Sequence, residues 1–598
     1  MVGFGRFTAG RPEAGADPVR AAIVANKALF VAAFIFSFAM SILALTTSFY
    51  MLQVYDRVLS SRSEDTLLML TLIAAVAITV FGVLDSIRIR LLVRIGMRVG
   101  STLSSSVLRA MVATTSQNSG MTIRSSLRDV DTLRGFIGSA SLGALMDAPF
   151  ILVYLVVLYL LDPVFVVIVL LGGAILVSIA IANQRLTNPI LVRSIFLGMQ
   201  AHEFAEDGLR NADILEGMGM SSTFVGRWRK HWIESLQIGT VASDQDSRLS
   251  SISKVVRMLI QVALLGAGAL LILDFRATGG IMIGATIIGA RALAPIESAV
   301  ASWKGVIAVR LAWARLVELL QKAPKREEGM KLPTPRGHVE VSSLYYAVPG
   351  TRKHILTNIS FDIAPGESLG IIGPSGSGKS TLLRLLVGAW PCTGGAVRLD
   401  GGDIYSWPRS EWGKHIGYLP QDVELFTGTV RENIARMAEG DPDAVVRAAQ
   451  QVHAHEMILA LPKGYDTEIG ENGHRLSGGQ GQRIGIARAL YGEPRLVVLD
   501  EPNSNLDGMG EDALVATLTE LKAQGVTVIV VAHRPRILNS VTKMLVLRAN
   551  GTVETFGPRA EVMQQYAKRA AAPTNVVPLS SAIAQPTVED GARPEFKT

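Results

Sequence analysis

Gly373-Pro374-Ser375-Gly376-Ser377-Gly378-Lys379-Ser380-Thr381 decides the fold of the second half of this chain. The stretch has the G-x-x-x-x-G-K-[ST] spacing of a loop that binds phosphate groups. It follows the apolar run 368–372, which predicts a buried strand, and precedes 382–386, which predicts the first turns of a helix. In that setting the backbone N–H groups and the helix N-terminus face a phosphate. We expect Lys379 to reach the β- and γ-phosphates of a nucleotide and Ser380 to hold Mg²⁺.

Two carboxylates follow a second apolar strand. Residues 496–499 are apolar, and Asp500 and Glu501 come directly after them. Asp500 suits Mg²⁺ or its water shell, and Glu501 suits orientation of an attacking water. Together with the phosphate-binding loop, this pair predicts a site that hydrolyses a nucleoside triphosphate.

The composition indicates a membrane protein with several domains. The 598 residues suggest roughly three to four domains. Hydrophobic residues make up 49% and charged residues 18% of the chain, and the mean hydropathy is +0.34. A net charge of +7 is compatible with nucleic-acid binding, but Lys and Arg on the cytoplasmic side of a membrane protein explain it more simply. The single cysteine, Cys392, excludes an intramolecular disulfide and a cysteine metal cluster within this sequence.

Six apolar stretches predict membrane-crossing helices. They lie at 28–50, 66–84, 143–161, 164–182, 258–273 and from about 280 onward. Basic residues before the first stretch and after the second place the N-terminus and that helix end in the cytoplasm. Polar, helical sequence up to 141 and over 183–256 predicts two helix pairs that extend into the cytoplasm, with tips near 116–120 and 211–219.

The sixth stretch contains Arg291, Pro295 and Glu297, so it is the least lipid-like of the six. A charge that faces lipid is costly. The two charged residues therefore either line a polar pathway or pair with other helices near the inner interface, and the sequence leaves both alternatives open.

The domain boundaries follow from these shifts in composition. We expect a cytoplasmic tail at 1–27, a membrane domain at 28–321, a charged linker at 322–336 and an α/β domain at 337–566. Residues 567–598 are rich in Ala, Pro, Ser and Thr, which predicts a disordered tail.

Leu476-Ser477-Gly478-Gly479-Gln480 resembles the signature sequence of the ATP-binding-cassette (ABC) proteins. Gln421, the segment 504–507 and His533 match the Q-loop, the D-loop and the switch histidine of that superfamily, in the expected order. The resemblance covers 337–566 and implies that the domain binds ATP and Mg²⁺. It implies that Ser477, Gly478, Gly479 and Gln480 face a γ-phosphate, that His533 contacts the same phosphate, and that Gln421 senses Mg²⁺ and the attacking water.

Two departures from the family pattern concern the nucleotide. The family usually has an aromatic residue directly before Pro349-Gly350 that stacks on adenine, and Val348 stands there. Tyr346 or Tyr345 could take that role, and core packing is the alternative for each. Asn503 and Asn505 replace the Thr and Ala usual near the D-loop, but both carboxylates remain.

Six spans followed by one such domain resemble the ABC exporters. The implied fold class is an α-helical six-span transmembrane domain fused to an α/β P-loop nucleotide-binding domain. The segment 467–471 resembles the exporter X-loop. In this superfamily the signature sequence faces the phosphate-binding loop of a second domain, and this chain has one of each. The resemblance therefore implies a half-transporter that works as a homodimer with two equivalent ATP sites.

A narrower resemblance, to bacterial type I secretion exporters, rests on 49–59, 128–134 and 289–295. Only 27 residues precede the first span, which leaves no room for an N-terminal peptidase-like domain and favours the branch that exports proteases, lipases or S-layer proteins with uncleaved C-terminal signals. The resemblance implies an inner-membrane ATPase, surrounded by membrane lipid, that exports an unfolded polypeptide. Its implied partners are a periplasmic membrane-fusion adaptor and an outer-membrane channel.

Two other functions stay open at this point. An exporter of lipid, glycan or drug would use the same ATPase for another cargo. A soluble P-loop protein acting on nucleic acid is the third possibility, but the uncharged stretch 28–50 argues against it and against nucleic acid as a partner.

Overall fold

The structure is a computed structural model that describes residues 18–115, 126–323, 333–348, 351, 353–470 and 473–570. The described residues form two compact units, a helical one that ends at 323 and an α/β one that begins at 333. The expected tails lie outside the described residues over 1–17 and 571–598. The expected linker lies outside them over 324–332, and so does the first expected helix-pair tip.

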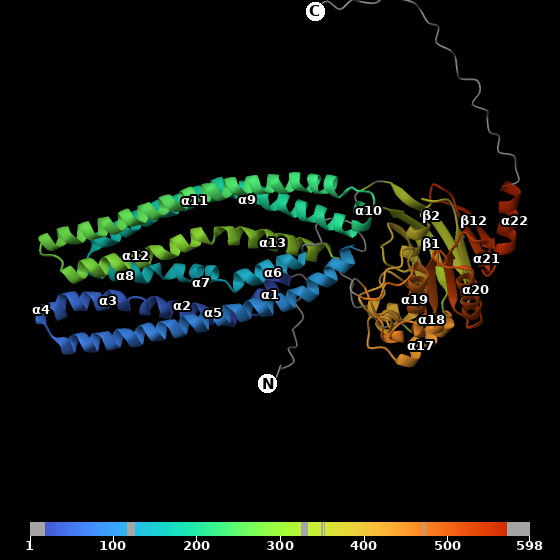
Figure 1. Ribbon diagram of the computed structural model, residues 1–598, viewed down its shortest axis with the longest axis horizontal. Helices are drawn as coiled ribbons and strands as arrows, with labels where there is room; N and C mark the ends of the chain where they lie inside the picture. The colour runs from blue at the N-terminus through green and yellow to red at the C-terminus, as the bar shows by residue number, and fades with distance from the viewer. Residues whose placement is uncertain are drawn as a thin grey trace, which may run out of the picture. The chain divides into compact units, whose positions relative to one another are not determined.

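The described part of the first unit is built from helices alone, several of them very long (Figure 1). In chain order the helices are α1 (Pro18–Val24), α2 (Lys27–Leu43), α3 (Thr46–Gln53), the π-helical turn η1 (Val54–Val58), α4 (Leu59–Ser61), α5 (Glu64–Thr115), α6 (Ser126–Ile137), α7 (Ala140–Asp147), the 3₁₀ turn η3 (Ala148–Phe150), α8 (Ile151–Leu161), α9 (Pro163–Arg210), α10 (Ala212–Gly217), α11 (Ser221–Leu273), α12 (Gly279–Ala301) and α13 (Trp303–Lys322).

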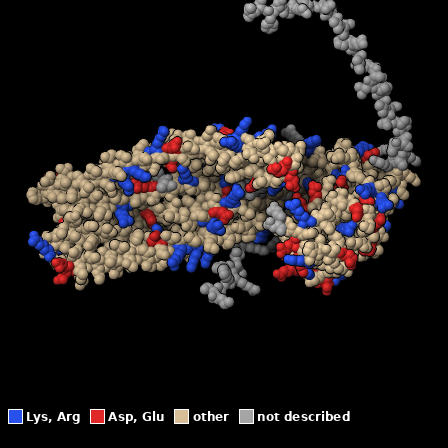
Figure 2. Space-filling view, in the orientation of Figure 1, with Lys and Arg blue, Asp and Glu red and all other residues tan. Residues whose placement is uncertain are grey.

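Six helical segments among the described residues are long and apolar enough to cross a membrane, as the sequence predicts. They are Lys27–Ser61, Glu64–Thr115, Ala140–Leu161, Pro163–Arg210, Ser221–Leu273 and Gly279–Ala299. In the view of Figure 2, Lys, Arg, Asp and Glu gather at the tip that carries α4, and the surface next to that tip is largely free of them. Such a surface is expected where side chains meet lipid.

Three of these helices are much longer than a bilayer is thick. α5, α9 and α11 have 52, 48 and 53 residues, so at about 1.5 Å per residue each is more than twice as long as a hydrocarbon core of about 30 Å. α9 and α11 lie side by side (Figure 1). The short helix α10 joins them, at the position where the sequence predicts the tip of the second helix pair.

Two carboxylates bind the loop between α11 and α12 to the loop between α8 and α9 and to the turn η1. Asp162 accepts a hydrogen bond from the backbone N–H of Val164 at the start of α9, over 2.9 Å, and pairs with Arg276 over 2.8 Å. Asp56, in the π-helical turn η1, accepts hydrogen bonds from Thr278 and from the backbone N–H of Gly280. These contacts set where α12 begins.

The α/β unit contains a mixed six-stranded sheet and an antiparallel four-stranded sheet. The strands are β1 (Val339–Ala347), β2 (His354–Ile363), β3 (Ser368–Ile372), β4 (Gly394–Leu399), β5 (Gly402–Asp403), β6 (Ile416–Leu419), β7 (Gly428–Thr429), β8 (Glu468–Ile469), β9 (Leu496–Asp500), β10 (Thr527–Val531), β11 (Lys543–Leu547) and β12 (Val553–Pro558). The large sheet has the order β12-β11-β3-β10-β9-β6 and is parallel except for β12. The smaller sheet has the order β2-β1-β4-β5, and β7 pairs with β8.

Helices cover both faces of the large sheet. The helices of this unit are α14 (Lys379–Leu386), α15 (Arg409–His415), α16 (Val430–Ile434), α17 (Pro442–Gln451), α18 (His455–Leu459), the 3₁₀ turn η4 (Gly464–Asp466), α19 (Gly478–Leu490), α20 (Gly508–Ala523), α21 (Pro535–Leu538) and α22 (Arg559–Ala570).

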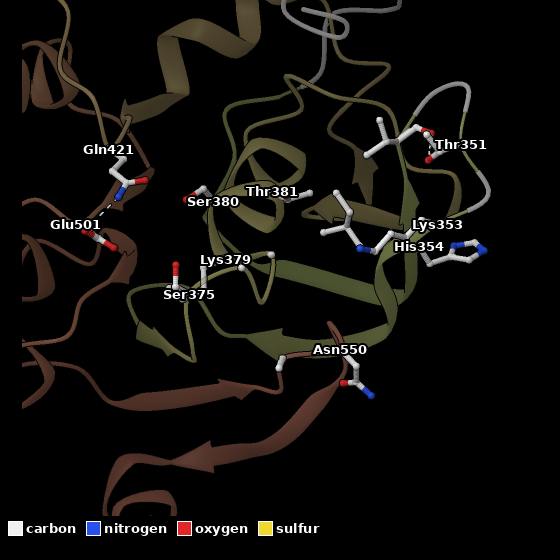
Figure 3. Close-up of a pocket in the computed structure, with 15 residues that line it drawn as sticks. Thr351, Lys353, His354, Ser375, Lys379, Ser380, Thr381, Gln421, Glu501 and Asn550 are labelled. Atoms are coloured by element: carbon white, nitrogen blue, oxygen red, sulfur yellow. Dashed lines mark hydrogen bonds between the residues drawn. The ribbon is translucent and has the colours of Figure 1, made fainter. Parts of the chain in front are cut away.

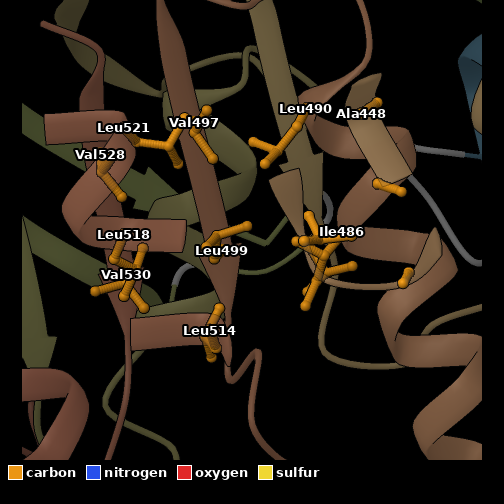
Figure 4. Close-up of a cluster of buried hydrophobic side chains, with 14 of the residues drawn as sticks. Ala448, Ile486, Leu490, Val497, Leu499, Leu514, Leu518, Leu521, Val528 and Val530 are labelled. Atoms are coloured by element: carbon orange, nitrogen blue, oxygen red, sulfur yellow. The ribbon is translucent and has the colours of Figure 1, made fainter. Parts of the chain in front are cut away.

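Each face of the large sheet has its own hydrophobic core, because successive side chains of a strand point to opposite faces. Val497 and Leu499 of β9 pack with residues of α19 and α20 on one face (Figure 4). Val498 of β9 belongs to the cluster on the other face, with residues of α14 and the smaller sheet. The strands β3, β9 and β10 are buried at every position, as expected for central parallel strands. This packing brings the residues that follow β3 and β9 to the same edge of the sheet.

Candidate functional site

A cavity of about 640 Å³ opens at that edge of the sheet (Figure 3). Most of the predicted phosphate-binding loop lines it, together with side chains from the β1–β2 hairpin and from the turn after β11. The lining residues are Val348, Thr351, Lys353, His354, Ile355, Ser375, Gly376, Gly378, Lys379, Ser380, Thr381, Gln421, Glu501, Ala549 and Asn550. The other predicted loop residues, Gly373, Pro374 and Ser377, shape the loop without lining the cavity.

Glycine is required at two points of this loop. Gly378 precedes α14 with φ +91°, a left-handed conformation that residues with a side chain rarely adopt. At Gly373 an added Cβ would lie 2.7 Å from the backbone oxygen of Leu547. The loop therefore closes tightly, and Lys379 donates hydrogen bonds to the carbonyls of Gly373 and Pro374 over 2.9 and 3.1 Å. The ammonium group of Lys379 is thus held at the loop that lines the cavity.

The residues around Asp500 fit a divalent cation. Asp500 is 2% exposed, and its Oδ1 is buried without a hydrogen-bond partner among the described residues. Burial raises the pKa of this carboxyl above its usual range, and a hydrogen bond from Ser380 acts in the opposite direction. A buried carboxylate oxygen without a donor, next to a hydroxyl group, is the hard oxygen donor set that Mg²⁺ prefers. Ser380 and Asp500, both predicted as metal ligands, are therefore brought together.

Three further predicted residues meet beside Asp500. Gln421 Nε2 donates a hydrogen bond to Glu501 Oε2 over 3.4 Å, and His533 Nε2 lies 3.6 Å from Glu501 Oε1. The residues come from the ends of β6, β9 and β10, all at one edge of the sheet. Glu501 has φ +46°, a left-handed backbone conformation. Strain of this kind is most often found at functional sites.

The signature residues do not line the cavity. Ser477 caps the N-terminus of α19, where its hydroxyl accepts a hydrogen bond from the N–H of Gln480 and the Gln480 side chain accepts one from the N–H of Ser477. Gly478 and Gly479 lie against Asn505, and an added Cβ at Gly479 would be 2.9 Å from the Asn505 backbone oxygen. Within one chain, the structure does not bring Ser477, Gly478, Gly479 and Gln480 to the phosphate-binding loop.

Tyr346 is not placed to stack on adenine, which corrects the expectation for this residue. Its side chain is 4% exposed and its ring stacks on Trp390, with 5.2 Å between the ring centroids. Burial also raises the pKa of its hydroxyl. The strand β1 turns Tyr346 toward the core because its residues alternate between the two faces, so core packing is the alternative that the structure favours. Val348, which replaces the usual aromatic residue, lines the cavity instead.

Sequence reasoning missed several cavity residues. Thr351, Lys353 and His354 come from the β1–β2 hairpin, and Asn550 comes from the turn between β11 and β12 (Figure 3). They belong to no motif that the sequence analysis used. The available signal was the run of polar residues in the hairpin that precedes the phosphate-binding strand.

The helical unit and the nucleotide site together define an ABC exporter, an ATPase coupled to transport. The family model described as ABC transporter matches residues 356–504. A relative described as "Type I secretion system ATP-binding protein PrsD", from Rhizobium meliloti (strain 1021), is 40% identical over 555 residues, which cover 92% of this chain and 94% of that protein. The chain therefore belongs to the family of type I secretion ATP-binding proteins.

More distant relatives and a solved structure agree with this assignment. "Cyclolysin secretion/processing ATP-binding protein CyaB" of Bordetella pertussis (strain Tohama I) is 28% identical over 551 residues, which cover 89% of this chain and 76% of that protein. "Leukotoxin translocation ATP-binding protein LktB" of Mannheimia haemolytica is 28% identical over 560 residues, with 91% and 77% covered. A solved structure described as "Structure of a bacterial Atm1-family ABC exporter with ATP bound" is similar to this chain with a TM-score of 0.79 and 22% sequence identity. The similarity covers 92% of this chain and 99% of that chain, which shows the exporter fold.

Proposed function

We propose that this protein hydrolyses ATP to export an unfolded polypeptide across the bacterial inner membrane, as the ABC component of a type I secretion system. The observation that carries the proposal is the 40% identity with PrsD over 92% of the chain. Residues 28–321 serve as the membrane domain and 337–566 as a cytoplasmic nucleotide-binding domain. Other relatives are named for the secretion or translocation of cyclolysin and leukotoxin, which favours a protein cargo over lipid, glycan or drug.

The residues at the cavity have distinct roles in hydrolysis. The backbone of the 373–381 loop and Lys379 bind the ATP phosphates. Ser380, Asp500 and Gln421 would hold Mg²⁺, which would neutralise phosphate charge. Glu501 orients the attacking water, and His533, 3.6 Å from Glu501, donates a hydrogen bond toward the γ-phosphate.

The active form is a homodimer with two composite ATP sites. Within one chain Ser477, Gly478, Gly479 and Gln480 lie outside the cavity, although they present a hydroxyl and N–H groups of the kind that bind phosphate. A second copy supplies these groups to complete each site. Closure of the two nucleotide-binding domains on ATP then drives the membrane helices.

The proposed partners are a periplasmic membrane-fusion adaptor and an outer-membrane channel, with membrane lipid around the helical unit. We propose that the cargo carries an uncleaved C-terminal signal, as in the protease, lipase and S-layer branch. The similarity of 49–59, 128–134 and 289–295 to type I secretion exporters supports this choice.

Secretion of matched cargo proteins tests the proposal. Cells that contain the protein, an adaptor and an outer-membrane channel should secrete an intact candidate cargo and retain the same cargo without its C-terminal region. The exporter purified from the strain with the intact cargo and from the strain with the truncated cargo should have the same basal ATPase rate. Unimpaired secretion of the truncated cargo would contradict the C-terminal signal. Transport of a lipid or drug by the purified protein, with no response to any polypeptide, would replace the proposal by the alternative cargo.

A second cargo variant tests whether the chain must be unfolded. A fast-folding domain fused ahead of the signal should stall secretion, because opening it costs its free energy of unfolding of about 5–15 kcal/mol. A destabilised version of the same domain serves as the control and should be secreted.

A further inference from the structure

The helical unit has a charged cavity of its own, with a volume of about 270 Å³. Its walls come from α2, α5, α7, α8 and α12, which belong to four of the segments able to cross a membrane. The charged residues in its wall are Asp85, Arg88, Asp147 and Arg291. Charged side chains inside membrane-crossing segments are costly and commonly mark a functional site.

Arg88 is already neutralised by its neighbours. It is 8% exposed, and it donates hydrogen bonds to Asp147 over 2.6 Å, to Asp85 over 2.9 Å and to Ser37 over 3.0 Å. The guanidinium group of Arg88 thus acts as a structural tie between α2, α5 and α7. Only its Nε lacks a hydrogen-bond partner among the described residues.

Arg291 on α12 lines the same cavity and has no such partner. No described residue forms a hydrogen bond or an ion pair with its side chain. By contrast Glu297, farther along α12, forms an ion pair with Arg257 of α11, with 3.1 Å between Glu297 Oε1 and Arg257 Nε. Glu297 thus has an ion-pair partner on another helix, whereas Arg291 lines its cavity without one among the described residues.

Pro295 interrupts the regular hydrogen bonding of α12 at this place. Pro295 lies inside α12 and lines the cavity. A proline has no N–H, so the carbonyl of the residue four positions earlier, Arg291, loses its helical hydrogen bond. The cavity wall at Arg291 offers a cationic donor, and the hydroxyl-bearing residues Ser41, Tyr154 and Ser298 line the same wall.

We propose that this cavity is a subsite for the exported polypeptide, in which Arg291 binds a carboxylate of the passing chain. The inference rests on the proposed protein export. A polypeptide segment suits the wall because its amide groups both donate and accept hydrogen bonds, so they can pair with the hydroxyl groups and with the carboxylates of Asp85 and Asp147 while a side-chain carboxylate pairs with Arg291. A lipid phosphodiester only accepts hydrogen bonds, so it has no donor for those two carboxylates.

Binding of two matched peptides to the purified full-length protein in nanodiscs tests the subsite. One probe is a labelled, unstructured Gly/Ser peptide with several Glu residues, and its twin has Gln at those positions. The Glu peptide should bind the wild type more tightly than the Gln twin does. Arg291→Gln should lower the affinity for the Glu peptide roughly ten- to hundredfold, because a hydrogen bond to a charged group is lost. It should leave the affinity for the Gln twin unchanged.

Two further variants separate the charge from general damage. Arg291→Lys keeps the cation and should recover much of the affinity. Arg90→Gln removes an exposed arginine of α5 that does not line the cavity, and it should leave the affinity for both peptides unchanged. Equal binding of both peptides by the wild type, or an equal effect of Arg291→Gln on both, would overturn the subsite. An Arg291→Gln effect seen only as lost binding of phosphatidylglycerol in nanodiscs would assign the cavity to lipid and also overturn it.

Secretion separates this inference from the proposed function. In cells, the wild type should secrete an acidic cargo, and Arg291→Gln should secrete it more slowly while the basal ATPase rate is retained. If the wild type secretes no polypeptide, the proposed function fails. If the wild type and Arg291→Gln secrete the acidic cargo at the same rate, protein export stands and the subsite alone is wrong.

Discussion

Asp129 of α6 and Arg315 of α13 form a two-point ion pair, with Nε donating over 2.9 Å and Nη2 over 2.5 Å. The Asp129 side chain is 6% exposed and the Arg315 side chain 25%. The hydrogen bond to Asp129 raises the pKa of Arg315 further above its ordinary value, so the pair stays charged. It joins the helix that follows residues 116–125 to the last helix of the helical unit.

Asp129→Ala should lower the thermal stability of the purified protein clearly. It leaves a partly buried arginine without its partner, at a cost of about 3 kcal/mol, the low end for buried pairs because Arg315 keeps some exposure. The double variant Asp129→Leu with Arg315→Met should recover most of the loss.

Arg134→Gln on the same helix is the matched control for that measurement. It breaks an exposed pair with Asp131, where both side chains are more than half exposed. Loss of such a pair costs less than about 1 kcal/mol. Equal shifts in the melting temperature for the two sites would contradict the role given to the buried pair.

Glu501→Gln should keep ATP binding and lose most ATP hydrolysis. The glutamine retains the shape of the side chain but loses the carboxylate that we propose orients water, and loss of such a group costs roughly 10²–10⁴ in rate. ATP binding and single-turnover hydrolysis by the purified variant provide the measurement. Turnover near that of the wild type would refute the assignment.

Mixed dimers should show that each ATP site is shared between two chains. A dimer with Lys379→Ala in one chain and Ser477→Arg in the other should keep one intact composite site. A dimer with both changes in one chain and none in the other should have both sites damaged. ATP binding per site in cross-linked dimers of defined composition distinguishes the two arrangements. The same number of intact sites in both would contradict the shared site.

Cys392, the single cysteine in the sequence, should react slowly with an alkylating reagent in the native protein. Burial, with a smaller contribution from the negative charge of Asp403, raises the pKa of its thiol to about 11. The reactive thiolate is therefore scarce at pH 8, and the native rate should rise about tenfold per pH unit up to the pKa. In denaturant the pKa returns to its ordinary range, so labelling at pH 8 should become fast. Rapid native labelling at pH 8 would show that the thiol is not held in this environment.

The motif-bearing parts of the site were predictable from the sequence because local spacing determines them. The 373–381 loop follows a buried strand and opens a helix, and Asp500 ends another strand of the same sheet, so parallel packing alone brings them together. Tyr346 could not be assigned in this way. Its environment depends on the stacking partner Trp390, which is 44 positions away and whose contact no local pattern predicts.

The six membrane-crossing segments were predictable because length and hydropathy decide them. The partners of their charged residues were not, since these come from distant helices. Glu297 meets Arg257 of α11, while Arg291 meets a cavity lined by several other helices. From the sequence alone, Glu297 and Arg291 are both simply charged residues in the sixth apolar stretch.

Stability and turnover are in conflict at Glu501. Its left-handed backbone, with φ +46°, costs a residue with a side chain about 1 kcal/mol or more, while glycine adopts this conformation freely and asparagine does so more readily than most residues. Replacement by either residue would relieve the strain and remove the carboxylate that we propose orients the attacking water. A search for thermostable variants would therefore tend to select inactive proteins at this position, and the glutamate persists only where ATP turnover itself is under selection.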